Sequence, residues 1–150
     1  MKDADIDTYI DALMSEYTNQ IKDWKTDVEI KNKNLRVVNI EQASYLARYD
    51  EIRVEIKALL DYYDMRVKQV RSEALKVISK HSAYDYNSTE KEKIIDSDPT
   101  YLKYKRIYIE INEMFNLLSS ISDQFKNRAY TLNNLVKIYT ASLEDITLFE

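Results

Sequence analysis

The sequence of 150 residues contains no glycine and no cysteine, and it has only one proline and one histidine. Phosphate-binding loops, dinucleotide fingerprints and nucleophile elbows need glycine, because only a residue without Cβ allows their sharp turns and close ligand approach. Zinc, haem-thiolate and iron–sulfur sites, and Ser-His-Asp or Cys-His catalysis, need more histidine or cysteine than His81 alone supplies. A carboxylate-only metal site or a lysine-based activity stays open, although no residue spacing supports either. The composition therefore predicts a protein that is not an enzyme and that binds no metal or cofactor.

Long apolar runs are also missing, and no stretch approaches the about 18 apolar residues of a membrane span. The first seven residues are acidic and polar, which is not the pattern of a secretory signal. The absence of cysteine fits a reducing compartment. We therefore expect one soluble domain over residues 1–150, located in the cytoplasm, with no membrane partner.

The sequence is rich in helical periodicity, whereas the Gly-rich turns of β-hairpins are missing. Asp98 and Pro99 supply an N-cap and a first-turn proline, which predicts the start of a long C-terminal helix over 99–145. Its apolar residues follow alternating steps of three and four, the heptad pattern of helices that associate with one another. This seam consists of Tyr101, Tyr104, Tyr108, Ile111, Phe115, Leu118, Ser122, Phe125, Ala129, Leu132, Val136, Tyr139 and Leu143.

A second apolar seam predicts a long helix over 40–81, and it runs through Ile52, Ile56, Leu59, Tyr63, Val67, Val70, Ala74 and Val77. Residues 1–39 are expected to form a shorter N-terminal helix, with Asp7 as its cap, followed by a break between Glu29 and Asn39. Residues 82–98 are expected to be a polar connector with a short helix that begins at a Thr89–Glu92 capping box. The predicted fold is all-α: two long helices and a shorter N-terminal helix in a self-associating helical bundle.

The net charge of −4 argues against nucleic acid, but basic residues concentrate in two segments. Residues 46–81 carry eight basic and six acidic side chains, and residues 101–139 carry six basic and three acidic ones. A solvated helix face is the ordinary explanation of such segments. Several copies of the chain in a ring would instead repeat each patch and add weak fields into a strong one.

The stretch Ile56-Lys57-Ala58-Leu59-Leu60-Asp61-Tyr62-Tyr63, followed by Arg66, resembles the Leu-Lys-Ala-Arg-Leu-Asp-Tyr-Tyr element of the UvsY-like family of phage recombination mediators. The resemblance extends over about residues 45–145 and includes an acidic spacer (Glu92 to Asp98) and a terminal pattern of Arg128, Tyr130, Leu132, Leu135 and Tyr139. It implies a homo-oligomer, ring-like in shape, that binds single-stranded DNA through basic residues. It also implies that the protein weakens the grip of a single-strand-binding protein and helps to load the phage recombinase.

Lys57 matches the basic lysine of the family element, whereas Leu59 stands where the family has a second basic residue. Leu59 lies on the predicted seam, so we expect it to pack in the core, and Tyr62 is a candidate for stacking on bases. The basic residues that we expect to contact DNA are Arg53, Lys57, Arg66, Lys68, Arg71, Lys103, Arg106 and Arg128. The alternative function is a non-enzymatic structural or assembly adaptor that oligomerises through its long helices. The net acidity, the carboxylates between the basic residues and Leu59 favour that alternative.

Overall fold

The computed structural model describes residues 3–81 and 86–141, and these residues form α-helices without any strand among them. The predicted all-α class is therefore confirmed. The helices in chain order are α1 (Asp3–Ile21), α2 (Trp24–Val28), α3 (Leu35–His81), α4 (Ser88–Asp96) and α5 (Pro99–Thr140).

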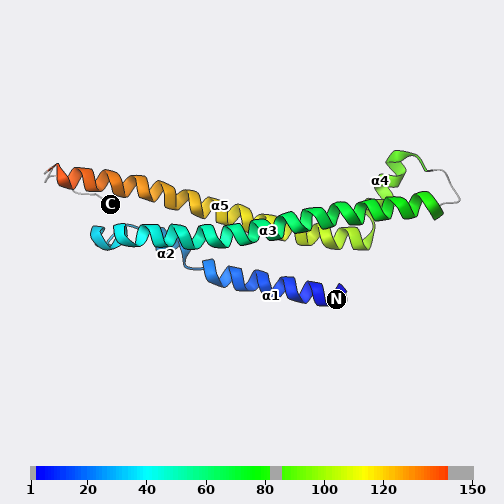
Figure 1. Cartoon of the computed structure of the whole chain (residues 1–150), viewed down its shortest axis with the longest axis horizontal. Coiled ribbons are helices and arrows are strands. Elements are labelled where there is room, and N and C mark those ends of the chain that lie inside the picture. The colour runs from blue at the N-terminus through cyan, green and yellow to red at the C-terminus, as the bar shows by residue number, and fades with distance from the viewer. Residues whose placement is uncertain (1–2, 82–85, 142–150) are drawn as a thin grey trace.

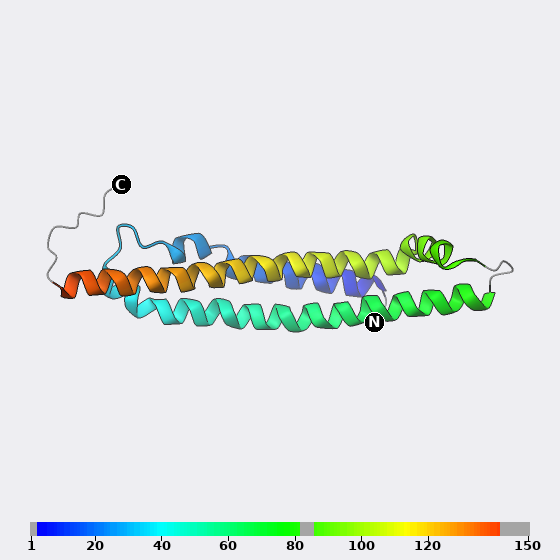
Figure 2. The same ribbon diagram turned by 90° about the horizontal axis from the view of Figure 1, so that it is seen from above.

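The molecule is elongated because its two long helices, α3 and α5, lie side by side and antiparallel along its whole length (Figures 1 and 2). The helix α1 runs along the middle of this pair, and the short helix α4 lies at the end where α3 finishes and α5 begins (Figure 1). A 47-residue helix spans about 70 Å at 1.5 Å per residue, so a shorter third helix covers only part of the pair.

The core is the seam between α3 and α5, where aromatic and aliphatic side chains from both helices interlock. The Phe125 ring stacks on Tyr49 at 5.1 Å and on Tyr45 at 5.9 Å between ring centroids. Each large side chain that is removed from water in this way contributes about 1.5–3 kcal/mol. The predicted seams account for most of the core residues, which include Ile52, Ile56, Tyr63, Val70, Tyr101, Tyr104, Ile111, Leu118, Phe125 and Leu132.

The start of α3 differs from the sequence prediction, because the helix begins at Leu35 rather than near residue 40. The Asn34 side chain accepts hydrogen bonds from the backbone N–H groups of Arg36 (3.0 Å) and Val37 (3.4 Å) and so caps the helix. Asn32 has a φ of 62°, a left-handed conformation that asparagine tolerates, and it reverses the chain without glycine. The break is therefore shorter than predicted.

The other helix ends test three predicted caps. The Asp98 side chain accepts from the backbone N–H of Tyr101 at 2.8 Å with Pro99 in the first turn, as predicted. The capping box of α4 is formed by Asn87 and Glu90 rather than by Thr89 and Glu92, because asparagine caps at least as well as threonine and lies two residues earlier. The helix α1 begins at Asp3, so Asp7 is inside the helix and is not its cap. Residues 142–145 of the predicted last helix lie outside the described residues.

Arg128 is buried, although the sequence analysis expected it to contact DNA. Its side chain is 3% exposed between the two long helices, with the guanidinium 5.8 Å from the Tyr45 ring and 5.7 Å from the Phe125 ring. Its Nη1 donates to Gln42 Oε1, and the amide of Gln42 donates to the backbone carbonyl of Phe125 at 2.7 Å. Burial lowers the pKa of Arg128 because it penalises the charged form. Arg128 is therefore a core residue and cannot reach a phosphate in this conformation.

The Arg128 site predicts opposite effects for two substitutions. The Nε and Nη2 atoms of Arg128 have no hydrogen-bond partner among the described residues. Arg128→Met removes this buried charge and keeps the apolar packing, so the free energy of unfolding should stay unchanged or rise by about 1–4 kcal/mol. Gln42→Ala removes a hydrogen-bond partner of the guanidinium, so it should lower the free energy of unfolding by about 1–3 kcal/mol. Urea denaturation monitored by circular dichroism measures both.

Tyr130→Ala is the matched control, since Tyr130 is 71% exposed two residues away on the same helix and should change stability by less than about 0.5 kcal/mol. A loss of stability in Arg128→Met as large as that in Gln42→Ala would show that the buried cation is a net stabilising group, against the prediction.

Candidate nucleic-acid interface

Four of the predicted DNA-binding residues lie on one face of α3, because their spacing of four, eleven and three residues follows the helical repeat. We call Arg53, Lys57, Lys68 and Arg71 the cationic stripe. Carboxylates alternate with these cations: Arg53 Nε lies 3.0 Å from Asp50 Oδ1, Lys57 Nζ 2.5 Å from Asp61 Oδ1, and Lys68 Nζ 2.6 Å from Asp64 Oδ2. The interruption of the basic face that the sequence predicted is therefore a row of ion pairs.

These ion pairs are close in distance but weakly held, because water surrounds them. The side chains of Lys57 and Asp61 are 50% and 63% exposed, and those of Lys68 and Asp64 are 73% and 43% exposed. Exposed pairs gain little in high dielectric and are screened by salt, so a phosphate can replace the carboxylate at small cost. The hydrogen bond to Asp64 raises the pKa of Lys68, so this ammonium stays charged at any physiological pH. The stripe is a set of cations that can exchange one anion for another.

Neighbouring helices hold both ends of the cationic stripe. At one end Arg71 Nη2 lies 3.7 Å from Glu92 of α4. At the other end the Ser122 hydroxyl of α5 donates to Asp50 at 2.8 Å. Burial alone would raise the pKa of Asp50, but the hydrogen bonds from Ser122 and Arg53 outweigh burial and lower it. The carboxylate therefore stays ionised and fixes Arg53 in place.

The sequence analysis missed Lys126, which belongs beside this end of the stripe. Its positive charge contributes to lowering the pKa of Asp50, so α5 places a further cation near Arg53. The signal was present in the sequence: Lys126 follows the polar seam residue Ser122 by four positions, one helical turn. Lys126 also lies 3.2 Å from Asp123, the same intrahelical pairing that the stripe shows.

The other three predicted cations gather where α3 meets the start of α5. Arg66 donates to the Tyr104 hydroxyl at 3.3 Å, and its guanidinium lies 5.2 Å from the centroid of that ring. Lys103 and Arg106 flank Tyr104 in the sequence of α5 and share one helical face, and Arg106 Nε lies 3.3 Å from Glu110. The structure thus divides the eight predicted residues into the stripe, this second group of three, and the buried Arg128.

Leu59 is half-buried and packs against the core, as expected for a residue of the predicted seam. The neighbouring Lys57 keeps its ammonium at the surface, 5.8 Å from the centroid of the Phe115 ring of α5. The stretch from Ile56 to Tyr63 therefore presents one cation, Lys57, at the surface. Tyr62 of the same stretch is 51% exposed.

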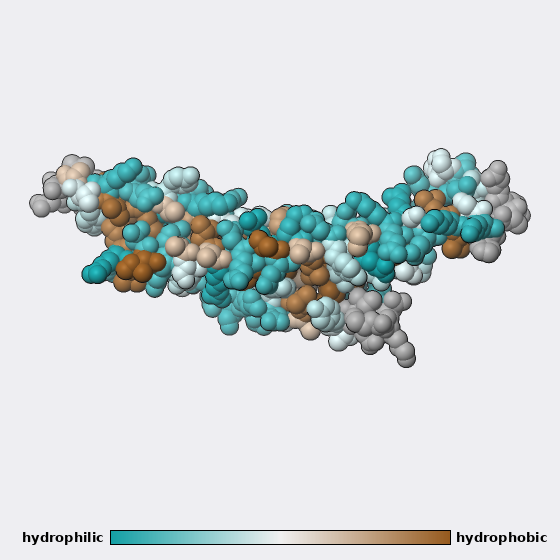
Figure 3. Space-filling model, in the orientation of Figure 1, coloured by the Kyte–Doolittle hydropathy of each residue, from teal (hydrophilic) through white to brown (hydrophobic). Residues whose placement is uncertain are grey.

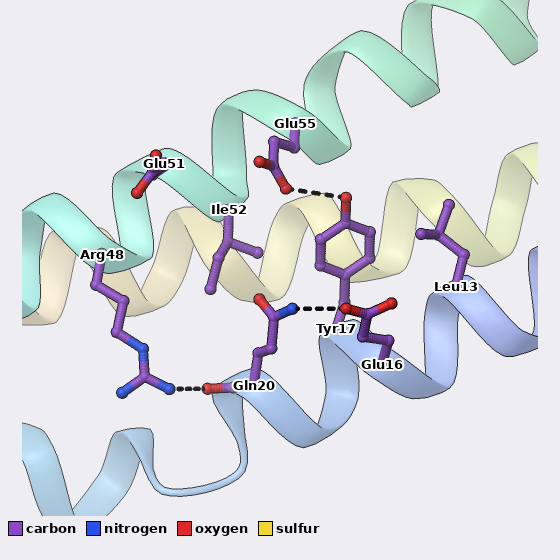
Figure 4. A pocket seen from close by; sticks show the side chains of 8 residues that line it. All are labelled: Leu13, Glu16, Tyr17, Gln20, Arg48, Glu51, Ile52 and Glu55. Atoms are coloured by element: carbon purple, nitrogen blue, oxygen red, sulfur yellow. Dashed lines mark hydrogen bonds between the residues drawn. The ribbon is translucent and has the colours of Figure 1, made fainter.

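A groove between α1 and α3 is lined mainly by polar side chains and is acidic in character (Figure 4). The Tyr17 hydroxyl donates to Glu55 at 3.0 Å, and burial followed by this hydrogen bond raises the pKa of Tyr17 to about 12. Arg48 donates to the backbone carbonyl of Gln20 at 2.5 Å. With Glu16 and Glu51 also in its lining, the groove repels phosphate and attaches α1 to α3 instead. It is therefore not a site for DNA.

Among residues 3–81 and 86–141, no group of three or more His, Cys, Asp or Glu side chains is placed to hold a metal ion. In the same part of the chain, every helix is too short or too polar to pass through a lipid bilayer.

Comparison with known proteins finds a solved structure with a similar fold. No family model and no curated protein matches the sequence. Among solved structures, the crystal structure of the bacteriophage T4 recombination mediator protein UvsY matches with a TM-score of 0.70 and 16% sequence identity. The match covers 81% of this chain and 97% of the UvsY chain. The chain therefore has the fold of UvsY, and the resemblance that the sequence indicated is confirmed at the level of the fold.

Proposed function

We propose that this chain is a recombination mediator: it binds single-stranded DNA and assists the loading of a recombinase onto a strand coated by single-strand-binding protein. The observation that carries the proposal is the fold, which superposes on nearly the whole of the T4 mediator UvsY. The exposed cations of α3 and α5 support it, because a strand of DNA requires a row of positive charges. We further propose that the protein acts in the cytoplasm and has no catalytic role.

The proposed binding is electrostatic and independent of DNA sequence. Lys and Arg contacts to phosphates position a strand but carry no sequence information. Each cation of the stripe exchanges its carboxylate for a phosphate and releases a counterion, so affinity should fall steeply as salt rises. One chain presents few such cations, and a homo-oligomer, in the shape of a ring, would repeat them along one strand.

The cationic stripe predicts a change in salt dependence. The double substitution Lys57→Ala/Lys68→Ala should weaken binding to a labelled oligothymidylate and reduce the slope of log K against log salt concentration by about 1.4, since each single-strand phosphate contact contributes about 0.7. The double substitution Asp61→Asn/Asp64→Asn should strengthen binding, because it removes the competing carboxylates. Fluorescence anisotropy at several salt concentrations measures both variants.

Lys137→Ala is the control, since Lys137 is also an exposed lysine and lies near the far end of α5. It should leave the slope unchanged. A slope in Lys57→Ala/Lys68→Ala equal to that of the natural chain would remove the stripe from the interface. If the natural chain binds no oligonucleotide even at low salt, the structural adaptor becomes the better function.

The end of the α3–α5 pair at which α3 begins and α5 finishes supports the proposal of a homo-oligomer. The two helices cover each other's seams along most of their length, but hydrophobic side chains gather at the surface where α3 begins and α5 ends (Figure 3). Ile40 is 70% exposed, Val37 is 49% exposed, and Tyr139 is 70% exposed beside a groove that Leu35 and Val136 also line. Exposed apolar groups of this size are typical of a surface that another protein covers.

Self-association through this end predicts the effect of Ile40→Asp. The carboxylate would have to be buried without a partner in the interface, so the assembly should dissociate into smaller species. Light scattering coupled to gel filtration measures the mass, and circular dichroism checks that the helices persist. Val54→Asp is the matched control, because Val54 is 63% exposed on the same helix away from this end. An unchanged mass in Ile40→Asp would place the interface elsewhere.

A further inference from the structure

Tyr62 is an exposed aromatic residue that packs against a buried aromatic residue. Its ring is 51% exposed and packs edge-on against Tyr63, with 5.3 Å between centroids and 84° between ring planes. Tyr63 is 4% exposed, and its ring lies 6.3 Å from that of Tyr104, which is 5% exposed. The exposed ring thus packs against one buried ring, which in turn lies near a second buried ring.

The phenols around Tyr63 form one cluster. Burial raises the pKa of Tyr63 to about 12, and the neighbouring hydroxyls of Tyr62, Tyr104 and Tyr9 add to the effect. Tyr63 is therefore neutral at physiological pH. Tyr9 of α1 is 57% exposed, so α1 contributes a second accessible ring close to the same buried residue.

A cation lies one helical turn from Tyr62. Arg66 follows Tyr62 by four residues, which separates their Cβ atoms by about 5–6 Å on one face of α3. Arg66 donates to Gln69 at 2.7 Å and to Tyr104 at 3.3 Å, which together use two of the five N–H donors of a guanidinium. The hydrogen bond to Tyr104 raises the pKa of Arg66. An aromatic face and a fixed positive charge with donors to spare therefore lie side by side.

We propose that Tyr62, supported by Tyr63 and flanked by Arg66, is a stacking site for one nucleobase of a bound single strand. The inference rests on the proposed function and adds a base-binding site to its phosphate contacts. Stacking is available to every base because each has a π-face, so the site preserves binding without sequence readout. Bases in a duplex are already stacked on one another, so the site favours single strands over duplexes.

The surroundings of Tyr62 indicate how the strand runs. Glu55 lies about two turns before Tyr62 on α3 and is held by the hydroxyl of Tyr17. On the face of α3 that carries Tyr62, the Glu55 carboxylate repels phosphates before Tyr62 and Arg66 attracts them after it. Arg53 and Lys57 of the cationic stripe lie on the opposite face, since nine residues from Arg53 to Tyr62 are two and a half turns. A base on Tyr62 therefore directs its backbone toward Arg66 and the start of α5, where Lys103 and Arg106 lie.

Two other exposed tyrosines show what distinguishes the site. Tyr130 and Tyr139 are 71% and 70% exposed, more than Tyr62. Within residues 3–81 and 86–141, however, neither ring stacks on another aromatic ring. Tyr130→Ala is thus a control for the loss of an exposed aromatic side chain without a supported ring.

The test compares two probes on the full chain: an oligothymidylate, and an oligonucleotide of equal length in which every sugar lacks its base. Fluorescence anisotropy at fixed salt should show that the natural chain binds the first more tightly than the second. Tyr62→Ala should weaken binding to oligothymidylate by about 5- to 150-fold, which corresponds to 1–3 kcal/mol per stacked base. It should leave binding to the abasic probe unchanged, because phosphate contacts remain.

Two further variants separate stacking from other effects. Tyr62→Phe keeps the ring and should bind as the natural chain does. Tyr62→Leu keeps an apolar side chain against Tyr63 and preserves the helix, and it should lose affinity as Tyr62→Ala does. This pair keeps the test decisive if Tyr62→Ala fails to fold. Tyr130→Ala should bind both probes as the natural chain does.

The outcomes distinguish the inference from the proposed function. If the natural chain binds neither probe, the proposed function fails. If it binds oligothymidylate with a steep salt dependence but Tyr62→Leu binds equally well, the stacking site is wrong and the proposed function stands. Equal weakening of both probes by Tyr62→Leu would also overturn stacking, because it would point to a change in the phosphate contacts. Loss of binding in Tyr62→Phe would assign recognition to the hydroxyl rather than the ring.

Discussion

The antiparallel packing of α3 against α5 is the constraint on which every other feature depends. Tyr49, Phe125 and Ile56 are completely buried in this seam, so one face of each long helix is committed to the partner helix. The residues on the other faces of the two helices determine which side chains are exposed along each edge of the α3–α5 pair. The cationic stripe lies on α3 where it borders α5, with Lys57 beside Phe115 and Asp50 bonded to Ser122. A shift of one residue between the helices would separate these contacts, so the core sets the geometry of the surface.

The sequence was sufficient to predict the long helices, because heptad periodicity is local and is repeated over many turns. It was also sufficient for the cap at Asp98, where acceptor and proline occur together. It was less informative where several residues can cap a helix. Asn34, Asn39, Asn87 and Thr89 are all reasonable caps, and the structure uses Asn34 and Asn87. In a chain without glycine, asparagine can adopt the left-handed backbone conformation of a turn, as Asn32 does with its φ of 62°.

The candidate site was predictable in part for the same reason. Helical spacing placed Arg53, Lys57 and Lys68 on one face, but it could not show that Arg128 is buried. The flank of a heptad seam is exposed or covered according to what packs there, and Arg128 lies between α3 and α5 with Tyr45 and Gln42 around it. Lys126 illustrates the opposite case, in which an unremarked residue of α5 lies close to Asp50 of α3. Charge patterns along one helix are visible in a sequence, whereas contacts between helices are not.

An acidic chain that is to bind a polyanion, as we propose for this one, needs two kinds of interaction that respond differently to salt. Exchange of carboxylates for phosphates on the stripe depends on salt, since it is driven by counterion release. Stacking on Tyr62 does not, because it is a contact between aromatic faces, and the buried ring of Tyr63 supports the exposed ring. A strand held in both ways would loosen its phosphates as salt rises and still keep a base in place. A mediator must hold DNA firmly enough to expose it and weakly enough to release it to a recombinase. Many weak, exchangeable cations combined with a few fixed aromatic contacts satisfy both requirements.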